Sequence, residues 1–135
     1  MVLVDAGPLI ALIHADDHHH RRCVAAFQQL TEPLGTVWPV LTEAMYLLAF
    51  SRKGQEALWE MLDRGAIVLL PLGNDEISRM RELMKKYRDL PMDLADAALV
   101  AVAERDQIRR IFTLDRRDFD VYRPAKLGRF IILPN

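Results

Sequence analysis

Short apolar runs alternate with longer segments of helical spacing along the whole chain. The apolar runs are bounded by Gly, Pro or Asp, which is typical of buried strands, and they predict five strands, at residues 2–4, 35–37, 66–70, 111–114 and 130–133. The segments between them repeat apolar residues every three or four positions and predict helices at residues 9–13, 17–30, 40–50, 54–64, 75–87 and 93–106. Gly7 and Pro8 predict a turn after the first strand, and Asp17 is expected to cap the second helix.

This alternation predicts an α/β fold. The strands are apolar on both faces and are separated by helices, as expected for a central parallel sheet of about five strands covered by helices. The helix at 93–106 is almost wholly apolar after its first turn and should be buried. No repeat or linker divides the chain, so residues 1–135 are expected to form one domain.

Composition narrows the class of protein. With 51% hydrophobic and 27% charged residues in 135 positions, the chain has the balance of a soluble domain rather than of a disordered segment. A net charge of -1 argues against a broadly basic, histone-like nucleic-acid binder. The single cysteine excludes an internal disulfide, and no signal-like segment or membrane-length apolar run is found, so a cytoplasmic location with no membrane contact is expected.

Four acidic residues lie where the predicted strands end and the helices begin. Asp5 follows the first strand, Asp115 follows the fourth, and Asp96 lies in the first turn of the buried helix. Glu43 lies early in the helix after the second strand, among apolar neighbours on a helix that faces the sheet, where an acid costs energy unless it is paired. The carboxyl ends of parallel strands share one edge, so these four side chains are expected to converge there.

Converging carboxylates have a specific chemical meaning. Any one of these acids alone would serve as an ordinary turn or cap residue. Four together repel one another, and a hard divalent cation such as Mg²⁺ or Mn²⁺ would compensate because it prefers oxygen ligands. Such an ion can assist the attack of water on a phosphodiester bond.

Four segments carry a resemblance to a known family. They are residues 4–12 (VDAGPLIAL), 40–44 (VLTEA), 93–101 (DLADAALVA) and 113–119 (TLDRRDF). In this order and context they resemble the PIN domain, and within it the VapC-type ribonuclease toxins of type II toxin–antitoxin pairs. The resemblance covers essentially the whole chain, and its fold, a parallel α/β sandwich, agrees with the prediction from the pattern.

The resemblance implies an endoribonuclease that depends on Mg²⁺ or Mn²⁺. Asp5 and Asp96 match the principal metal ligands, and Glu43 and Asp115 would complete the site directly or through water. Glu43 is expected to accept a proton from the attacking water. The implied partners are an RNA substrate, transfer RNA in many members, a cognate antitoxin protein as in VapBC pairs, and a second copy in a homodimer.

Several nearby residues leave alternatives open. Many family members carry Ser or Thr after the first aspartate, where this chain has Ala6. Asp93 could bind a second metal ion or merely cap a helix, and Asp118 is expected to be a turn residue. Arg116 and Arg117 adjoin Asp115, where one of them could contact a phosphate or both could simply be solvated.

A group of large apolar side chains is expected to be mostly core, with an exposed subset that could form a groove for an antitoxin helix; the group comprises Trp38, Met45, Tyr46, Phe50 and Trp59. The alternative to a nuclease is a catalytically weak PIN-fold module that only binds RNA or a protein partner. Without the four acids 18 basic residues stand against 15 acidic ones, so the near-zero total hides an acidic pocket in a mildly basic surface.

Overall fold

The computed structural model describes residues 1–135 and contains one parallel sheet. Its strands are short and are formed by Val2–Val4 (β1), Leu34–Thr36 (β2), Ile67–Leu69 (β3), Arg110–Phe112 (β4) and Ile131–Leu133 (β5). The helices are Ala6–Ile13 (α1), His20–Gln29 (α2), Trp38–Leu47 (α3), Arg52–Asp63 (α4), Ile77–Lys86 (α5), Leu94–Asp106 (α6) and Arg116–Val121 (α7), with a 3₁₀ turn at Asn74–Glu76 (η1). The predicted α/β fold with a five-stranded parallel sheet is confirmed.

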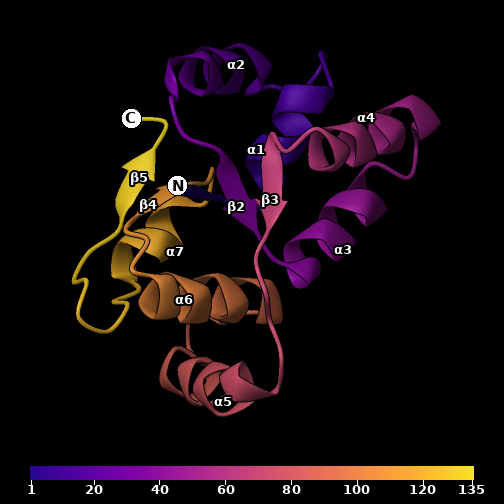
Figure 1. Ribbon diagram of the computed structural model, residues 1–135. Helices are drawn as coiled ribbons and strands as arrows, with labels where there is room; N and C mark the ends of the chain where they lie inside the picture. Colours follow the sequence, from indigo (N-terminus) through magenta and orange to yellow (C-terminus); the bar gives the residue numbers. More distant parts are fainter.

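Helices cover both faces of the sheet (Figure 1). On one side α1 packs against α2, α3 and α4, and on the other side α6 lies next to the sheet with α5 outside it. Because α6 lies between the sheet and α5, nine consecutive residues of this helix, Ala95–Ala103, are buried. The predicted burial of this apolar helix is thus confirmed.

The strand order decides where a site can form. The order is β3-β2-β1-β4-β5, so the chain first builds the sheet outward from β1 on one side and then returns to its other side with β4. The order therefore reverses between β1 and β4, and the crevice beyond the carboxyl ends of such a strand pair is the usual ligand site of open parallel sheets. Asp5 and Asp115 both lie just beyond this strand pair.

Two predicted boundaries are wrong. Gly7 and Pro8 form no turn, because α1 begins at Ala6, directly after its cap Asp5; proline is accepted there since the first turn of a helix needs no internal N–H donors. Asp17 does not cap α2. Its carboxylate accepts a hydrogen bond from the His19 N–H at 2.8 Å and so stabilises the turn before the helix.

The helix α7 was not predicted. It is only six residues long and lacks a clear apolar repeat, so nothing in its spacing distinguishes it from a turn. Its Phe119 is fully buried and packs edge-on against Phe130, with the ring centroids 5.7 Å apart. This tertiary contact anchors the helix. Asp118, predicted to be a turn residue, lies instead in the first turn of α7.

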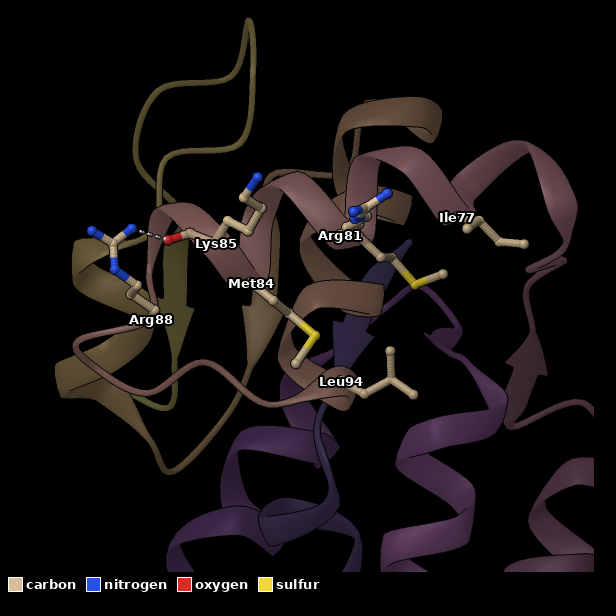
Figure 2. Close-up of a pocket in the computed structure, with 7 residues that line it drawn as sticks. Ile77, Arg81, Met84, Lys85, Arg88 and Leu94 are labelled. Carbon is tan, nitrogen blue, oxygen red and sulfur yellow. Dashed lines mark hydrogen bonds between the residues drawn. The ribbon is translucent and has the colours of Figure 1, made fainter.

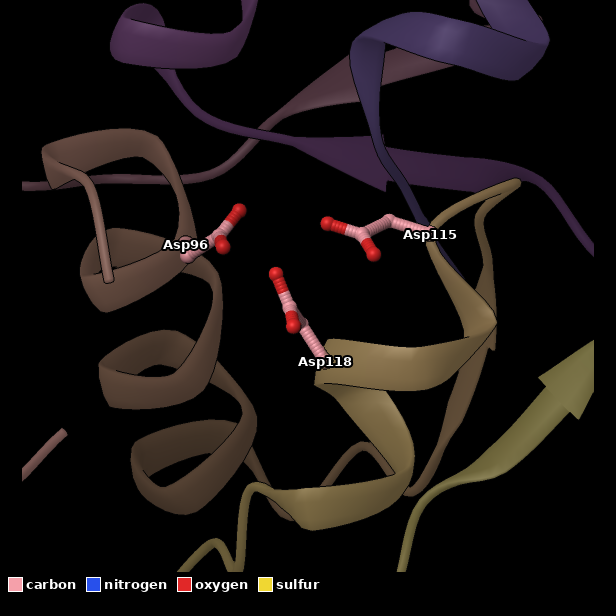
Figure 3. A group of neighbouring side chains, drawn as sticks. All are labelled: Asp96, Asp115 and Asp118. Carbon is pink, nitrogen blue, oxygen red and sulfur yellow. The ribbon is translucent and has the colours of Figure 1, made fainter. Parts of the chain in front are cut away.

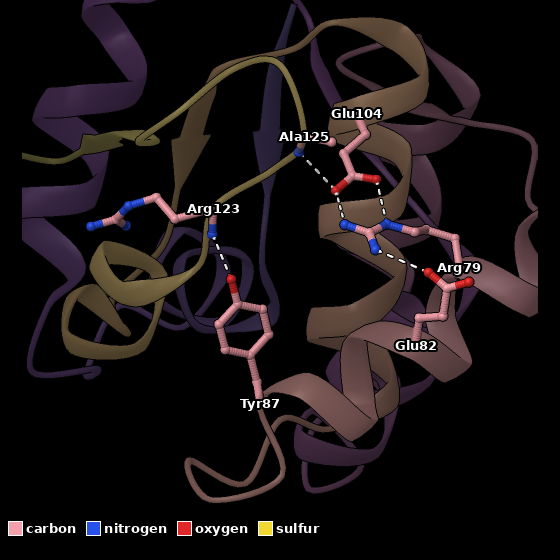
Figure 4. Close-up of polar contacts among 6 residues, drawn as sticks. All are labelled: Arg79, Glu82, Tyr87, Glu104, Arg123 and Ala125. Atoms are coloured by element: carbon pink, nitrogen blue, oxygen red, sulfur yellow. Dashed lines mark hydrogen bonds and ion pairs between the residues drawn. The ribbon is translucent and has the colours of Figure 1, made fainter.

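Polar contacts join α5, α6 and the segment after α7 (Figure 4). The Arg79 guanidinium donates two hydrogen bonds of 2.7 Å to the Glu104 carboxylate, which also accepts one from the backbone N–H of Ala125 at 2.9 Å. The Tyr87 hydroxyl accepts a hydrogen bond from the backbone N–H of Arg123 at 3.0 Å. These contacts fix the chain that follows α7 against the outer helix layer.

The expectation that the aromatic group of α3 and α4 is mostly core is wrong. Exposed fractions are 53% for Trp38, 79% for Tyr46, 65% for Phe50 and 49% for Trp59, and only Met45 is partly buried against the core. The helices bury their opposite faces, as α3 does through Val40, Leu41 and Ala44, and nothing covers the aromatic side. No helix of the protein is long and apolar enough to cross a membrane.

Candidate functional site

Three carboxylates from α6 and from the start of α7 meet at the carboxyl-terminal edge of the sheet (Figure 3). Asp96 lies in the first turn of α6, Asp115 lies just before α7, and Asp118 lies in its first turn. One potential ligand atom from each lies within 4.8 Å of the others. Asp96 is buried, Asp118 is half-buried and Asp115 is exposed, so the group opens to solvent on one side.

Asp5 is held beside this group by two hydrogen bonds. Its Oδ1 accepts from the Ala6 N–H at 2.8 Å, and its Oδ2 accepts from the Thr113 hydroxyl at 3.0 Å. The same hydroxyl accepts a hydrogen bond from the Asp115 N–H at 3.0 Å, so one side chain orients the ends of both β1 and β4. Burial raises the pKa of Asp5, although both hydrogen bonds to its carboxylate lower it, and the charge of Asp93 raises it further.

Glu43 and Asp93 lie beside these four carboxylates, and the six acids together form the acidic rim of the crevice. The Asp93 carboxylate caps α6 by accepting a hydrogen bond from the Asp96 N–H at 2.8 Å, so the capping alternative is confirmed. Partial burial, followed by the charges of Asp5 and Asp93, raises the pKa of Glu43. The Glu43 side chain is exposed: α3 turns Val40 and Ala44 inward and leaves Glu43 at the crevice edge.

The electrostatics show that the acids destabilise one another's ionised forms. Burial raises the pKa of Asp96 to about 8, and the charges of Asp5, Asp93 and Asp115 add to this effect. A hydrogen bond of 2.7 Å from the Tyr122 hydroxyl to Asp96 Oδ2 acts in the opposite direction by stabilising the carboxylate. Burial and the neighbouring charge of Asp118 raise the pKa of Asp115.

No cationic side chain pairs with these acids. The salt bridges of the protein lie elsewhere and take up Glu32, Glu76, Glu82, Glu104 and Asp106. A convergent set of oxygen donors without a counter-charge fits a divalent cation such as Mg²⁺ or Mn²⁺, whose preferred ligands are carboxylates and water. The donor set therefore suits the kind of metal ion expected from the sequence.

The structure brings the four predicted site residues to one crevice, and Asp93 and Asp118 join them. Sequence reasoning missed Thr113 and Tyr122, which hold Asp5 and Asp96 in place. Thr113 stands two positions before Asp115, so the motif containing it offered a signal. Tyr122 offered none, since it is 26 positions from the residue that it contacts.

The chain is similar to known proteins over the part that carries the acidic crevice. The PIN domain family model matches residues 2–124, a span that contains all six acids. The chain belongs to the PIN domain family. Ribonuclease VapC26 of Mycobacterium tuberculosis is 33% identical to it over 136 residues, covering 98% of this chain and 100% of the relative, which makes this chain a PIN domain of the VapC type.

Solved structures share the PIN fold at low sequence identity. VapC20 of Mycobacterium tuberculosis, described as a sarcin–ricin loop cleaving toxin, superposes with a TM-score of 0.78 at 18% identity, over 86% of this chain and 91% of that one. A toxin–antitoxin complex from Klebsiella pneumoniae gives 0.70 at 18% identity, over 90% and 92%. FitAcB from Neisseria gonorrhoeae gives 0.62 at 18% identity, over 97% of each chain.

At position 6, where many family members have Ser or Thr, this PIN domain has alanine, and a hydroxyl from another strand end contacts Asp5 instead. Ala6 is buried and offers no hydroxyl, and the hydroxyl that contacts Asp5 comes from Thr113. Of the two arginines beside the site, Arg116 donates hydrogen bonds to the backbone carbonyls of Ile132 and Pro134, which ties it to the end of the chain. Arg117 is exposed and makes no ion pair.

A groove of about 590 Å³ lies along α5 and is also lined by Leu94, the first residue of α6 (Figure 2). Its floor is apolar, and three cations border it: Arg81, Lys85 and Arg88. None of the three forms a salt bridge with a carboxylate, so their charges remain available to an anionic ligand.

Proposed function

We propose that this PIN domain is an Mg²⁺- or Mn²⁺-dependent endoribonuclease and that it is the toxin of a toxin–antitoxin pair. The observation that carries the proposal is the crevice in which six carboxylates converge without a cationic partner. Its place at the switch point of a parallel sheet and the 33% identity to a ribonuclease of the VapC type support the same conclusion. A divalent ion bound there would activate water and neutralise charge on the phosphate being cleaved.

The residues have separable roles in this proposal. Asp5 and Asp96 are the principal ligands because they are the most restrained by hydrogen bonds, from Thr113 and Tyr122. Asp115 completes the site directly or through water, and Asp118 lies close enough to do the same. Glu43 is exposed at the rim and its pKa is raised, which suits a group that accepts a proton from water.

The test is cleavage of RNA by the purified protein. Wild type with Mg²⁺ or Mn²⁺ should fragment RNA, and EDTA should stop the reaction. Asp96→Asn should lose about 100-fold of the rate or more, because changing even the groups behind metal ligands costs about 10–100-fold. Asp120→Asn, an exposed aspartate of α7 outside the crevice, is the matched control and should cleave like wild type. Equal activity of wild type and Asp96→Asn would refute the catalytic proposal and leave a module that only binds RNA or a partner.

The substrate is proposed to be a structured RNA. The unpaired cations Arg81, Lys85 and Arg88 line a groove that also includes Leu94, the residue between Asp93 and Ala95 at the start of α6, and they can contact phosphates of an RNA bound there. Transfer RNA is the first candidate, and ribosomal RNA is the second, because the VapC20 relative is described as cleaving the sarcin–ricin loop. Mapping of the fragment ends after separate digestion of the two pools distinguishes them.

The antitoxin is proposed to cover the exposed aromatic side of α3 and α4. Phe50 lines a small pocket together with Ile13 and Leu48, and its ring packs edge-on against the His14 ring, with the ring centroids 4.9 Å apart. Apolar faces of this kind suit an amphipathic helix of a partner. Coexpression with the product of the adjacent reading frame should give a stable complex, and Phe50→Asp should weaken it; growth arrest on expression of the protein alone is the second expected result.

A homodimer is proposed for the protein in the absence of the antitoxin. The exposed apolar side chains on its helices leave surface that a second copy can bury. Light scattering after size exclusion should give twice the mass of 15.5 kDa, and a monomer at micromolar concentration would refute this part of the proposal.

A further inference from the structure

A fully buried tyrosine, Tyr122, contacts one of the acids of the candidate metal centre. Tyr122 follows α7, has no exposed surface, and directs its hydroxyl to Asp96 Oδ2 at 2.7 Å. Its ring is held edge-on between Tyr87 and Phe119, with both centroid distances at 5.0 Å. The ring is thus fixed by packing, and the hydroxyl cannot turn away from the carboxylate.

The packing of the Tyr122 ring does not require the hydrogen bond between its hydroxyl and Asp96. A phenylalanine would make the same ring contacts, and the Tyr122 hydroxyl forms only this one hydrogen bond. On the other side of the contact, Oδ2 of Asp96 accepts no second hydrogen bond, and Oδ1 accepts none at all. The hydroxyl therefore occupies one carboxylate oxygen and leaves the other for a ligand.

We propose that Tyr122 is a positioning residue of the metal centre: its hydroxyl holds Oδ2 of Asp96 and so leaves Oδ1 as the oxygen that would bind the ion. This inference rests on the proposed function, because it concerns the same ion. The topology of the chain explains the arrangement, since Asp118 lies in α7 and Tyr122 directly follows this helix, so one segment carries both a neighbour of Asp96 and the hydroxyl that contacts it. Groups behind the direct ligands commonly change metal affinity by about 10–100-fold.

The test measures binding of Mn²⁺ alone, with no RNA, by electron paramagnetic resonance of the free ion. Tyr122→Phe keeps the ring and removes the hydroxyl, and its Kd for Mn²⁺ should rise by about 10-fold or more. Tyr87→Phe is the matched control. It removes a hydroxyl from the same aromatic cluster, where the hydroxyl accepts the Arg123 N–H and touches no carboxylate, so its Kd should equal that of wild type.

A rescue separates positioning from packing. With 4-aminophenylalanine at position 122 the ring again carries an N–H donor, and the Kd should return toward the wild-type value. If Tyr122→Phe does not fold, 4-fluorophenylalanine fills the hydroxyl's space without a proton to donate and should show the same weakened binding.

The outcomes are distinct. Equal Mn²⁺ affinity of wild type and the variants without a donor, or equal loss in Tyr122→Phe and Tyr87→Phe, overturns the inference while the proposed nuclease stands. Absence of Mn²⁺ binding by wild type overturns both. Weakened binding that the amino group restores supports the positioning role.

Discussion

Asp96→Asn should stabilise the metal-free protein, although it is expected to abolish metal binding. Burial and the neighbouring charges raise the pKa of Asp96 from 3.8 to about 8. A carboxyl group whose pKa is raised by folding stabilises the fold fully below its unfolded pKa, and this contribution is lost as the pH rises through the folded value. At about 1.4 kcal/mol per pKa unit, ionisation of Asp96 costs the fold about 5 kcal/mol at pH 8.

The net effect of the substitution is smaller than this cost. Asparagine has the shape of aspartate, and its side-chain oxygen can still accept the hydrogen bond from Tyr122. Its partly buried amide group loses hydration at a cost of about 2 kcal/mol. The free energy of unfolding at pH 8 should therefore rise by about 3 kcal/mol, which corresponds to about 10 °C in melting temperature for a chain of this size.

The assay is urea denaturation in EDTA, followed by circular dichroism at pH 8 and pH 5. At pH 5 the wild-type carboxyl group is protonated in the folded protein, so the advantage of Asp96→Asn should disappear. Asp120→Asn, with an exposed side chain on α7, should change the free energy of unfolding by less than about 0.5 kcal/mol. Equal midpoints for wild type and Asp96→Asn at pH 8 would refute the view that the unpaired acids strain the fold.

Three further variants test neighbouring parts of the structure. Thr113→Val removes the hydroxyl that donates to Asp5, so the pKa of Asp5 should rise further and the Kd for Mn²⁺ should increase about 10-fold in the binding measurement. The double variant Arg81→Ala, Lys85→Ala should weaken RNA binding, as measured by fluorescence anisotropy, and should reduce the slope of log affinity against log salt concentration by about two. Its Mn²⁺ binding should stay at the wild-type value. Glu104→Gln should lower the free energy of unfolding by about 2 kcal/mol in urea denaturation, because it weakens the paired hydrogen bonds from the α5 arginine; an unchanged midpoint would contradict a stabilising role for this contact.

The sequence predicted most of the fold because its signals are local. The strand 2–4 agrees with the structure at both ends, and the other strands lie within two residues of their predicted bounds, since buried parallel strands are short apolar runs closed by turn residues. The helix α7 escaped prediction because it is stabilised by the contact of Phe119 with Phe130, a tertiary contact that leaves no periodic pattern in six residues.

The surface around α3 shows the opposite failure. A group of large apolar side chains was expected to be mostly core, yet Tyr46 and Phe50 are exposed, because apolar character does not say whether another element covers the side chains. The same limit applies to Glu43, whose apolar neighbours pack inward while its own carboxylate lies at the crevice edge.

What the sequence determined by itself is the set of chemical groups and the edge at which they gather. Asp5, Asp96 and Asp115 follow strands or begin helices, and in a parallel sheet those positions share one end whatever the details of packing. Only the tertiary structure decided how these acids are held: that Thr113 joins the ends of β1 and β4, that Asp118 joins the group, and that a buried tyrosine orients Asp96. Hydrogen bonds between residues far apart in the chain depend on side-chain positions to within fractions of an ångström, and these are set by the packing of α6 and α7 rather than by any local pattern.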